Sequence, residues 1–136
     1  MAISKKLSLD NGIETKYHIV SLINAEYNKD IDVTVLSFIS KEYYQKALEQ
    51  NTLIAKKNEV DKEMENAFNF GNIEKAMKLQ EESDSLFNKI QSSKAFNEYV
   101  VSTNVVTIPY QDGITLPFIE QVLVTNGIFI NGKIIK

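Results

Sequence analysis

The chain has 136 residues, 43% hydrophobic and 24% charged, as expected for one globular domain spanning residues 1–136. It has no cysteine, which excludes disulfides, thiolate metal sites and a cysteine nucleophile. All 15 basic residues are lysine and the net charge is −3, so we expect no nucleic-acid partner. No apolar stretch is long enough for membrane insertion, and the first residues do not resemble a signal peptide, so we expect folding in the cytoplasm.

The first 40 residues carry the pattern of three strands. Strands are predicted over residues 3–9 and 13–23, joined by a tight turn at Asn11-Gly12, because an Asn-Gly pair accepts two positive φ angles. A third strand is predicted over 31–39. Its two faces are both apolar, which indicates a central strand covered on both sides.

The middle of the chain changes to helical periodicity. Ser40 can cap a helix over 41–68, and Asn72 can cap a second over 73–91, with Gly71 as the left-handed residue between them. The sequence therefore predicts an αα-hairpin over 41–91, inserted between β segments 1–40 and 98–136.

The last part of the chain returns to short elements. A helical turn near 94–97, a strand over 98–108 and a short helix over 115–125 are predicted in order. Residues 128–135 contain Asn131-Gly132 between apolar residues, which predicts a terminal β-hairpin. The fold class is thus α+β: a small antiparallel sheet with an inserted long αα-hairpin, a short C-terminal helix and a terminal β-hairpin.

The hairpin has a thin apolar stripe between polar flanks, and three uses fit this pattern. It could fold back on the sheet, pack against the same hairpin of other subunits, or engage a different partner. Because the stripe is too thin for full burial in one chain, we favour self-association or partner binding. The candidate interaction residues are Tyr43, Ile54, Met64, Phe68, Phe70, Ile73, Met77 and Phe87.

Residues able to do chemistry are scattered. His18 is the only histidine, and one histidine without cysteine or a compact acidic cluster makes a poor metal site, so no metal, cofactor or catalytic residue is assigned. The densest carboxylates, at 59–65 and 81–84, are interleaved with or close to lysines and indicate a solvated helix face. A catalytic carboxylate pair, hence a small enzyme, is the alternative that this pattern leaves open.

Two segments carry a family resemblance. The run from Lys5 to Ile13 (KKLSLDNGI), followed by Tyr17-His18-Ile19-Val20, resembles the start of small proteins encoded in the tail modules of phages and prophages of low-GC Gram-positive bacteria. The segment Thr107–Asp112 and the helix after it resemble a later part of those proteins. The similarity covers about the first and last 40 residues and omits the hairpin, and Ile19 stands where that family usually has arginine after the histidine.

This resemblance implies a non-enzymatic virion protein of a phage tail, baseplate or fibre attachment, assembled in the host cytoplasm. It implies several copies around a symmetry axis, hence a homo-oligomer with other tail or fibre proteins as partners, and it brings no catalytic residues. The alternative is a cytoplasmic tail-fibre assembly chaperone that binds its client through the hairpin.

Overall fold

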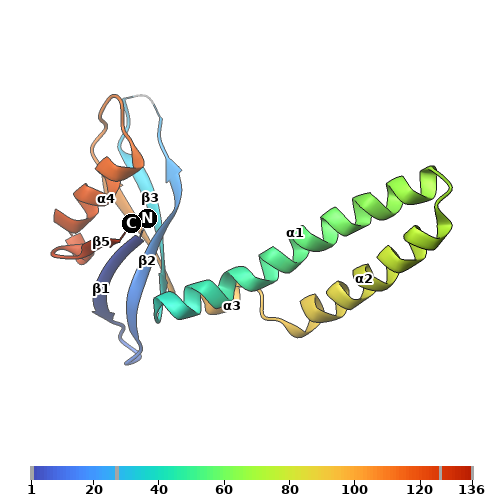
Figure 1. The fold of residues 1–136 in the computed structure, drawn as a ribbon. Helices are drawn as coiled ribbons and strands as arrows, with labels where there is room; N and C mark the ends of the chain where they lie inside the picture. The colour runs from blue at the N-terminus through green and yellow to red at the C-terminus, as the bar shows by residue number, and fades with distance from the viewer. Residues whose placement is uncertain (1, 27, 126, 136) are drawn as a thin grey trace. The chain divides into compact units, whose positions relative to one another are not determined.

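The computed structural model describes residues 2–26, 28–125 and 127–135, which form an α+β fold (Figure 1). Its elements in chain order are β1 (Ala2–Ser8), β2 (Glu14–Asn24), β3 (Ile31–Phe38), α1 (Lys41–Asn69), α2 (Ile73–Ser92), α3 (Phe96–Tyr99), β4 (Ser102–Ile108), α4 (Leu116–Thr125), the 3-10 helix η1 (Gly127–Phe129) and β5 (Lys133–Ile135). They divide into two compact units. One comprises residues 1–44 and 100–136, the sheet unit, and the other residues 45–99, the hairpin unit.

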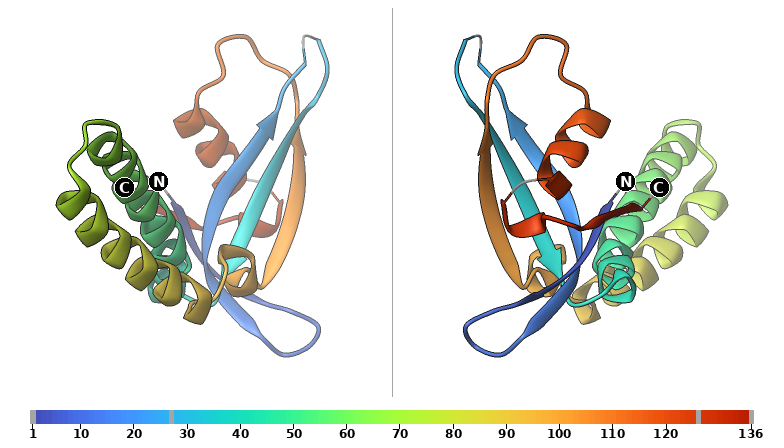
Figure 2. Two further views of the ribbon diagram at one scale, coloured as in Figure 1. Left: turned by 90° about the vertical axis from the view of Figure 1, so that its right-hand side faces the viewer. Right: turned by 90° about the vertical axis from the view of Figure 1, so that its left-hand side faces the viewer.

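The sheet unit is built on five antiparallel strands in the order β4-β3-β2-β1-β5. Helix α4 lies against one face of the sheet, as both views in Figure 2 show. This helix and η1 contribute three buried side chains to the core. The buried core residues are Ile3, Ile31, Val33, Val35, Ile108, Ile119, Leu123 and Phe129.

The third strand is covered less than its sequence predicts. It lies inside the sheet between β2 and β4, but only the face carrying Val33 and Val35 is buried along its length. On the other face Phe38 is buried, where its ring contacts Tyr44, whereas Leu36 is only half-buried. An apolar residue on a strand therefore did not guarantee a covering layer.

The terminal β-hairpin predicted over 128–135 is wrong. Residues 127–129 form η1, where the Ile130 N–H donates to the Gly127 carbonyl and the Asn131 N–H to the Val124 carbonyl. This turn inserts Phe129 into the core, and β5 then pairs with β1. Asn131 does adopt the left-handed conformation, with φ of 64°, but it reverses the chain after a helical turn and not between two strands.

His18 is a structural residue of the sheet unit. Its side chain is fully buried, with Nε2 2.7 Å from the Lys5 carbonyl oxygen and Nδ1 2.7 Å from Ser37 Oγ. Because a carbonyl only accepts, Nε2 carries the proton and Nδ1 accepts from the Ser37 hydroxyl. Burial lowers the pKa of His18 below its usual 6.5, partly opposed by the bond to Lys5.

Glu120 is a buried carboxyl on α4. It is 1% exposed, and neither carboxyl oxygen has a hydrogen-bond partner among the described residues. Burial raises the pKa of this carboxyl above its usual value, because the charged form is poorly solvated there. Glu120 therefore weakens the fold at any pH at which the unfolded chain would ionise it.

We predict that stability falls with acidification because of His18. A histidine whose folded pKa is lowered contributes stability that is present above the unfolded pKa of 6.5 and lost as pH falls through the folded pKa. The free energy of unfolding in urea should therefore drop from pH 7.5 to 5.5 more in the wild type than in His18→Gln. Equal drops in the two proteins would contradict this role.

We predict that Glu120→Met stabilises the protein at neutral pH by about 1–3 kcal/mol, because an apolar side chain of similar volume replaces a buried carboxyl that has no hydrogen bond among the described residues. The sign follows from linkage. A carboxyl with a raised folded pKa loses its stabilising contribution as pH rises through that pKa. The gain in melting temperature should therefore shrink at pH 4. The control is Glu82→Met at an exposed position of α2, which should leave the melting temperature nearly unchanged.

Candidate interaction surface

The hairpin unit is held by a narrow seam between α1 and α2. Three of the residues buried there, Ala67, Ala76 and Ser83, are small, so the helices can approach closely. Local contacts fix the turn that joins α1 to α2. Gly71 has a φ of 74°, the Asn72 N–H donates to the Ala67 carbonyl, and the Asn72 side chain caps α2 at the Lys75 N–H. The seam leaves most of the bulky side chains outside.

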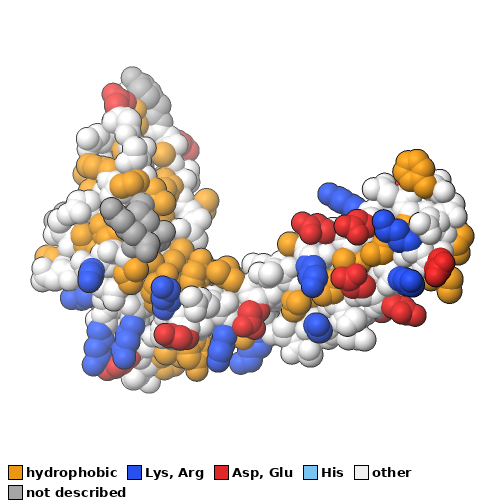
Figure 3. Space-filling model, in the orientation of Figure 1, with side chains coloured by type: hydrophobic (Ala, Val, Ile, Leu, Met, Phe, Trp, Pro, Cys, Tyr) orange, Lys and Arg blue, Asp and Glu red, His pale blue; other side chains and the backbone are white. Residues whose placement is uncertain are grey.

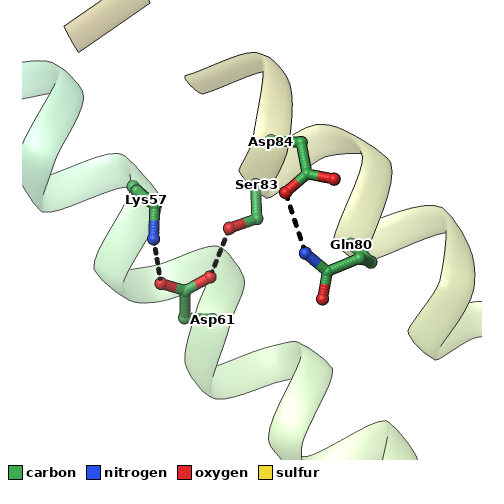
Figure 4. Close-up of polar contacts among 5 residues, drawn as sticks. All are labelled: Lys57, Asp61, Gln80, Ser83 and Asp84. Carbon is green, nitrogen blue, oxygen red and sulfur yellow. Dashed lines mark hydrogen bonds and ion pairs between the residues drawn. The ribbon is translucent and has the colours of Figure 1, made fainter. Parts of the chain in front are cut away.

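A polar link crosses the seam halfway along the hairpin (Figure 4). Asp61 on α1 accepts from Lys57 Nζ at 2.7 Å and from Ser83 Oγ of α2 at 2.6 Å. Both hydrogen bonds lower the pKa of Asp61, and the one from Lys57 has the larger effect. Beside them, the Gln80 amide donates to Asp84 at 2.9 Å. One face of the hairpin is therefore polar at its centre.

The same face is apolar on both sides of that polar centre. Ile54, Asp61 and Phe68 are seven residues apart on α1, which is close to two turns and places them on one line along the helix. Ile73, Gln80 and Phe87 form the corresponding line on α2. We call this surface the hairpin face; its residues are Ile54, Lys57, Asp61, Met64, Phe68, Ile73, Met77, Gln80, Asp84 and Phe87.

The hairpin face is hollowed near the tip, where the two helices join. A hollow of about 390 Å³ is lined by Met64 and Phe68 from α1 and by Ile73, Met77 and Gln80 from α2, with Glu65 and Ala76 completing it. Phe68 and Met77 are each 66% exposed. Figure 3 shows hydrophobic side chains running along the hairpin between charged ones. Such a hollow can take up an apolar group of a partner.

Six of the eight residues predicted for interaction lie on the hairpin face: Ile54, Met64, Phe68, Ile73, Met77 and Phe87. The structure places the other two elsewhere. Phe70 is 88% exposed but lines a separate hollow with Glu63 and Lys75 on the other flank of the tip. Tyr43 lies in the first turn of α1, and this first turn is part of the sheet unit, whereas the rest of α1 is part of the hairpin unit. The polar residues of the face, Asp61 and Gln80 above all, were not predicted. Each lies seven residues from two of the predicted apolar residues on its own helix, and the sequence alone shows this spacing.

A second exposed apolar area, on the sheet unit, was also not predicted. Leu22 of β2 and Val105 of β4 are 60% and 63% exposed, and both lie beside Thr34 in register on the face opposite α4. Half-buried Leu36 lies next along the same face of β3. Fewer large apolar side chains are exposed here than on the hairpin face.

Residues 2–26, 28–125 and 127–135 contain neither a metal cluster nor a membrane-spanning helix. In these ranges no three histidine or acidic side chains are grouped closely enough to hold a metal ion. Nor does any helix there combine the length and apolar character that crossing a membrane requires. The carboxylates of the hairpin unit lie mostly on exposed helix surface, as Glu81 and Glu82 do.

We predict that the link between Asp61 and Ser83 is asymmetric. Asp61→Ala leaves the buried Ser83 hydroxyl unpaired, at a cost of about 1–3 kcal/mol in unfolding free energy. Ser83→Ala should cost less, because Asp61 keeps Lys57 and is accessible to water. A double-mutant cycle measured by urea unfolding checks this, since the gain in helix propensity from alanine is similar in both variants. Additive effects would contradict the link.

Comparisons with known proteins complete the description of this surface. No protein-family model, curated protein or solved structure matches the chain. A functional conclusion therefore depends on the geometry of the hairpin face and on the resemblance of the two ends of the chain.

Proposed function

We propose that this protein is a non-enzymatic structural or adaptor subunit that works by binding other proteins through the hairpin face. The observation that carries the proposal is the exposure of large apolar side chains on both sides of the polar centre. In keeping with the resemblance of its ends, we further propose that it belongs to a phage tail, a baseplate or a phage-tail-like particle, with other tail or fibre proteins as partners.

The size of the exposed apolar area supports a binding role. Ile54, Phe68, Ile73, Met77 and Phe87 are 39–66% exposed. Taking about 200 Å² for a fully exposed large side chain, they together leave on the order of 500 Å² of surface in water. The largest apolar patch of a typical monomer is about 300–600 Å² and is often functional. The exposed part of these side chains adds nothing to the stability of the hairpin, and a partner that covers it would gain that burial.

The carboxylates of the hairpin support binding over catalysis. A catalytic pair needs a cleft that separates the pKa values of its two members. Asp61 is instead ion-paired to Lys57, and Asp84 accepts from the Gln80 side chain on the helix surface. Both arrangements give the hairpin face fixed polar groups that a partner can recognise.

A second candidate is favoured by the composition of the hollow. Met64 of α1 and Met77 of α2 both line it, and methionine side chains adjust to partners of different shape. Such a surface suits transient binding of a client, as in a tail-fibre assembly chaperone. This protein would then act in the cytoplasm and be absent from the finished particle.

Mass spectrometry of particles purified from cells that encode this chain separates the two. We expect the chain at a fixed stoichiometric ratio to the other tail proteins. Absence from the particle, together with co-purification with a fibre protein from the cell extract, would replace the structural role with the chaperone role.

We predict that Phe68→Ser combined with Met77→Ser lowers incorporation into particles at least tenfold without changing the melting temperature by more than a few degrees, because both side chains are largely exposed. The matched control is Phe70→Ser, which removes an even more exposed aromatic ring at the same tip but off the hairpin face. If the control is lost from particles equally, the hairpin face is not the binding surface.

A further inference from the structure

The two helices of the hairpin place similar groups at the same height. The Ser83–Asp61 hydrogen bond and the Gln50 amide, which donates to the Ile90 carbonyl at 3.3 Å, show which residues lie opposite one another. Counting along the two antiparallel helices from these contacts places Ile54 within about one helical turn of the level of Phe87, near the sheet-unit end.

The remaining levels follow in the same way. Asp61, which is bonded to Ser83, lies within about one helical turn of the level of Gln80, and Phe68 and Ile73 line one hollow at the tip. On both helices the hairpin face is therefore apolar near the sheet-unit end, polar in the middle and apolar again at the tip. The polar residues of α1 lie at about the same height along the hairpin as those of α2.

This matching makes the hairpin face complementary to itself. If a two-fold axis runs parallel to the hairpin between two copies, α1 of one copy lies over α2 of the other at equal height. Phe68 then meets Ile73 of the second copy, and Ile54 meets Phe87 of the second copy. Apolar groups meet apolar groups at both ends of the interface.

The polar centre also matches in this arrangement. Lys57 lies level with Asp84 of the second copy, so opposite charges meet. Asp61 lies level with Gln80 of the second copy, so a carboxylate meets an amide donor. Each helix is also antiparallel to both of its neighbours, as in an up-down four-helix bundle. No like charges meet among these pairs, which is the charge complementarity expected of a specific interface.

The other symmetric arrangement matches less well. With the two-fold axis across the hairpin, the tip of one copy lies over the sheet-unit end of the other, and α1 lies over α1. Asp61 then meets Asp61 of the second copy at the axis, and Met77 meets Asp84 of the second copy. Like charges and an apolar–charged pair lie at the centre, so the arrangement with both tips at one end is favoured.

The area is sufficient for a dimer. Two hairpin faces together bury on the order of 1,000 Å² of apolar side-chain surface by the measure used above, before polar atoms are counted. Specific interfaces bury about 1,200–2,000 Å² in total. A pair of hairpin faces therefore reaches this range once its polar centre is included.

We infer that the partner of the hairpin face is the hairpin face of a second copy, in a two-fold four-helix bundle whose two tips lie at the same end. The inference rests on the proposed function and specifies its partner. It gives the assembly unit of this protein as a dimer.

Sedimentation equilibrium of the purified full-length chain tests the association. We predict a dimer whose dissociation constant rises about tenfold in Asp84→Lys, because that change places two cations together at Lys57 of the second copy. The matched control is Glu82→Lys, the same charge change on α2 but on the opposite flank, which should leave the constant unchanged. A monomer at all concentrations up to about 0.5 mM, or equal effects of the two changes, would overturn the inference.

Disulfide cross-linking tests the direction, since the natural chain has no cysteine. Single-cysteine variants Phe68→Cys and Ile73→Cys, mixed and oxidised, should cross-link well above the rate for Phe70→Cys with Ile73→Cys, which reports collisions. Preferential cross-linking of Phe68→Cys with Ile54→Cys would show the opposite arrangement and overturn the inference.

The outcomes separate this inference from the proposed function. A monomeric chain that still enters particles through Phe68 and Met77 would contradict the dimer and leave the structural role standing, with a different protein as the partner. A dimer that is absent from particles and binds no tail protein would contradict the proposed function and leave the dimer standing.

Discussion

The function proposed for this protein depends on one constraint, which is that two antiparallel helices can bury only the side chains on the seam between them. Here small residues such as Ala67, Ala76 and Ser83 occupy much of that seam. Val60, Leu79 and Leu86 fill the rest of the seam, so Phe68 and Met77, which lie beside it, stay largely in water. The hydrophobic effect therefore favours any arrangement in which a further layer covers them, and that layer must come from another chain or another part of this one.

The sheet unit buries its apolar side chains in a different way. It buries one face under α4 and η1, and it places a neutral histidine, bonded at both ring nitrogens, inside that core. Glu120 is the exception, because a buried carboxyl that has no hydrogen bond among the described residues reduces stability. The two units thus differ in character: the sheet unit has a nearly closed core, whereas the hairpin unit exposes a large share of its apolar surface.

Sequence patterns predicted the elements that depend on local chemistry. The hairpin turns at Gly71 and Asn72 as predicted, because glycine in the left-handed region and an asparagine cap act within a few residues. The terminal strand and η1 depend instead on contacts between residues far apart in the sequence. The strand β5 pairs with β1, and Phe129 of η1 is buried in the core. The Asp61–Ser83 link joins residues 22 apart, so only the pairing of the helices could reveal it.

The way the hairpin is joined to the sheet has a consequence for how the chain can vary. Ser37 near the end of β3 pairs in register with Ser102 at the start of β4, and the Val101 N–H donates to the Ser37 carbonyl at 2.9 Å. The chain therefore leaves and re-enters the sheet at adjacent points, where a short reverse turn would otherwise close two neighbouring strands. An insertion at such a point can grow or shrink by whole helical repeats without altering a single strand pairing. The length of the hairpin and the residues of the hairpin face can therefore change while the strand pairings of the sheet stay the same.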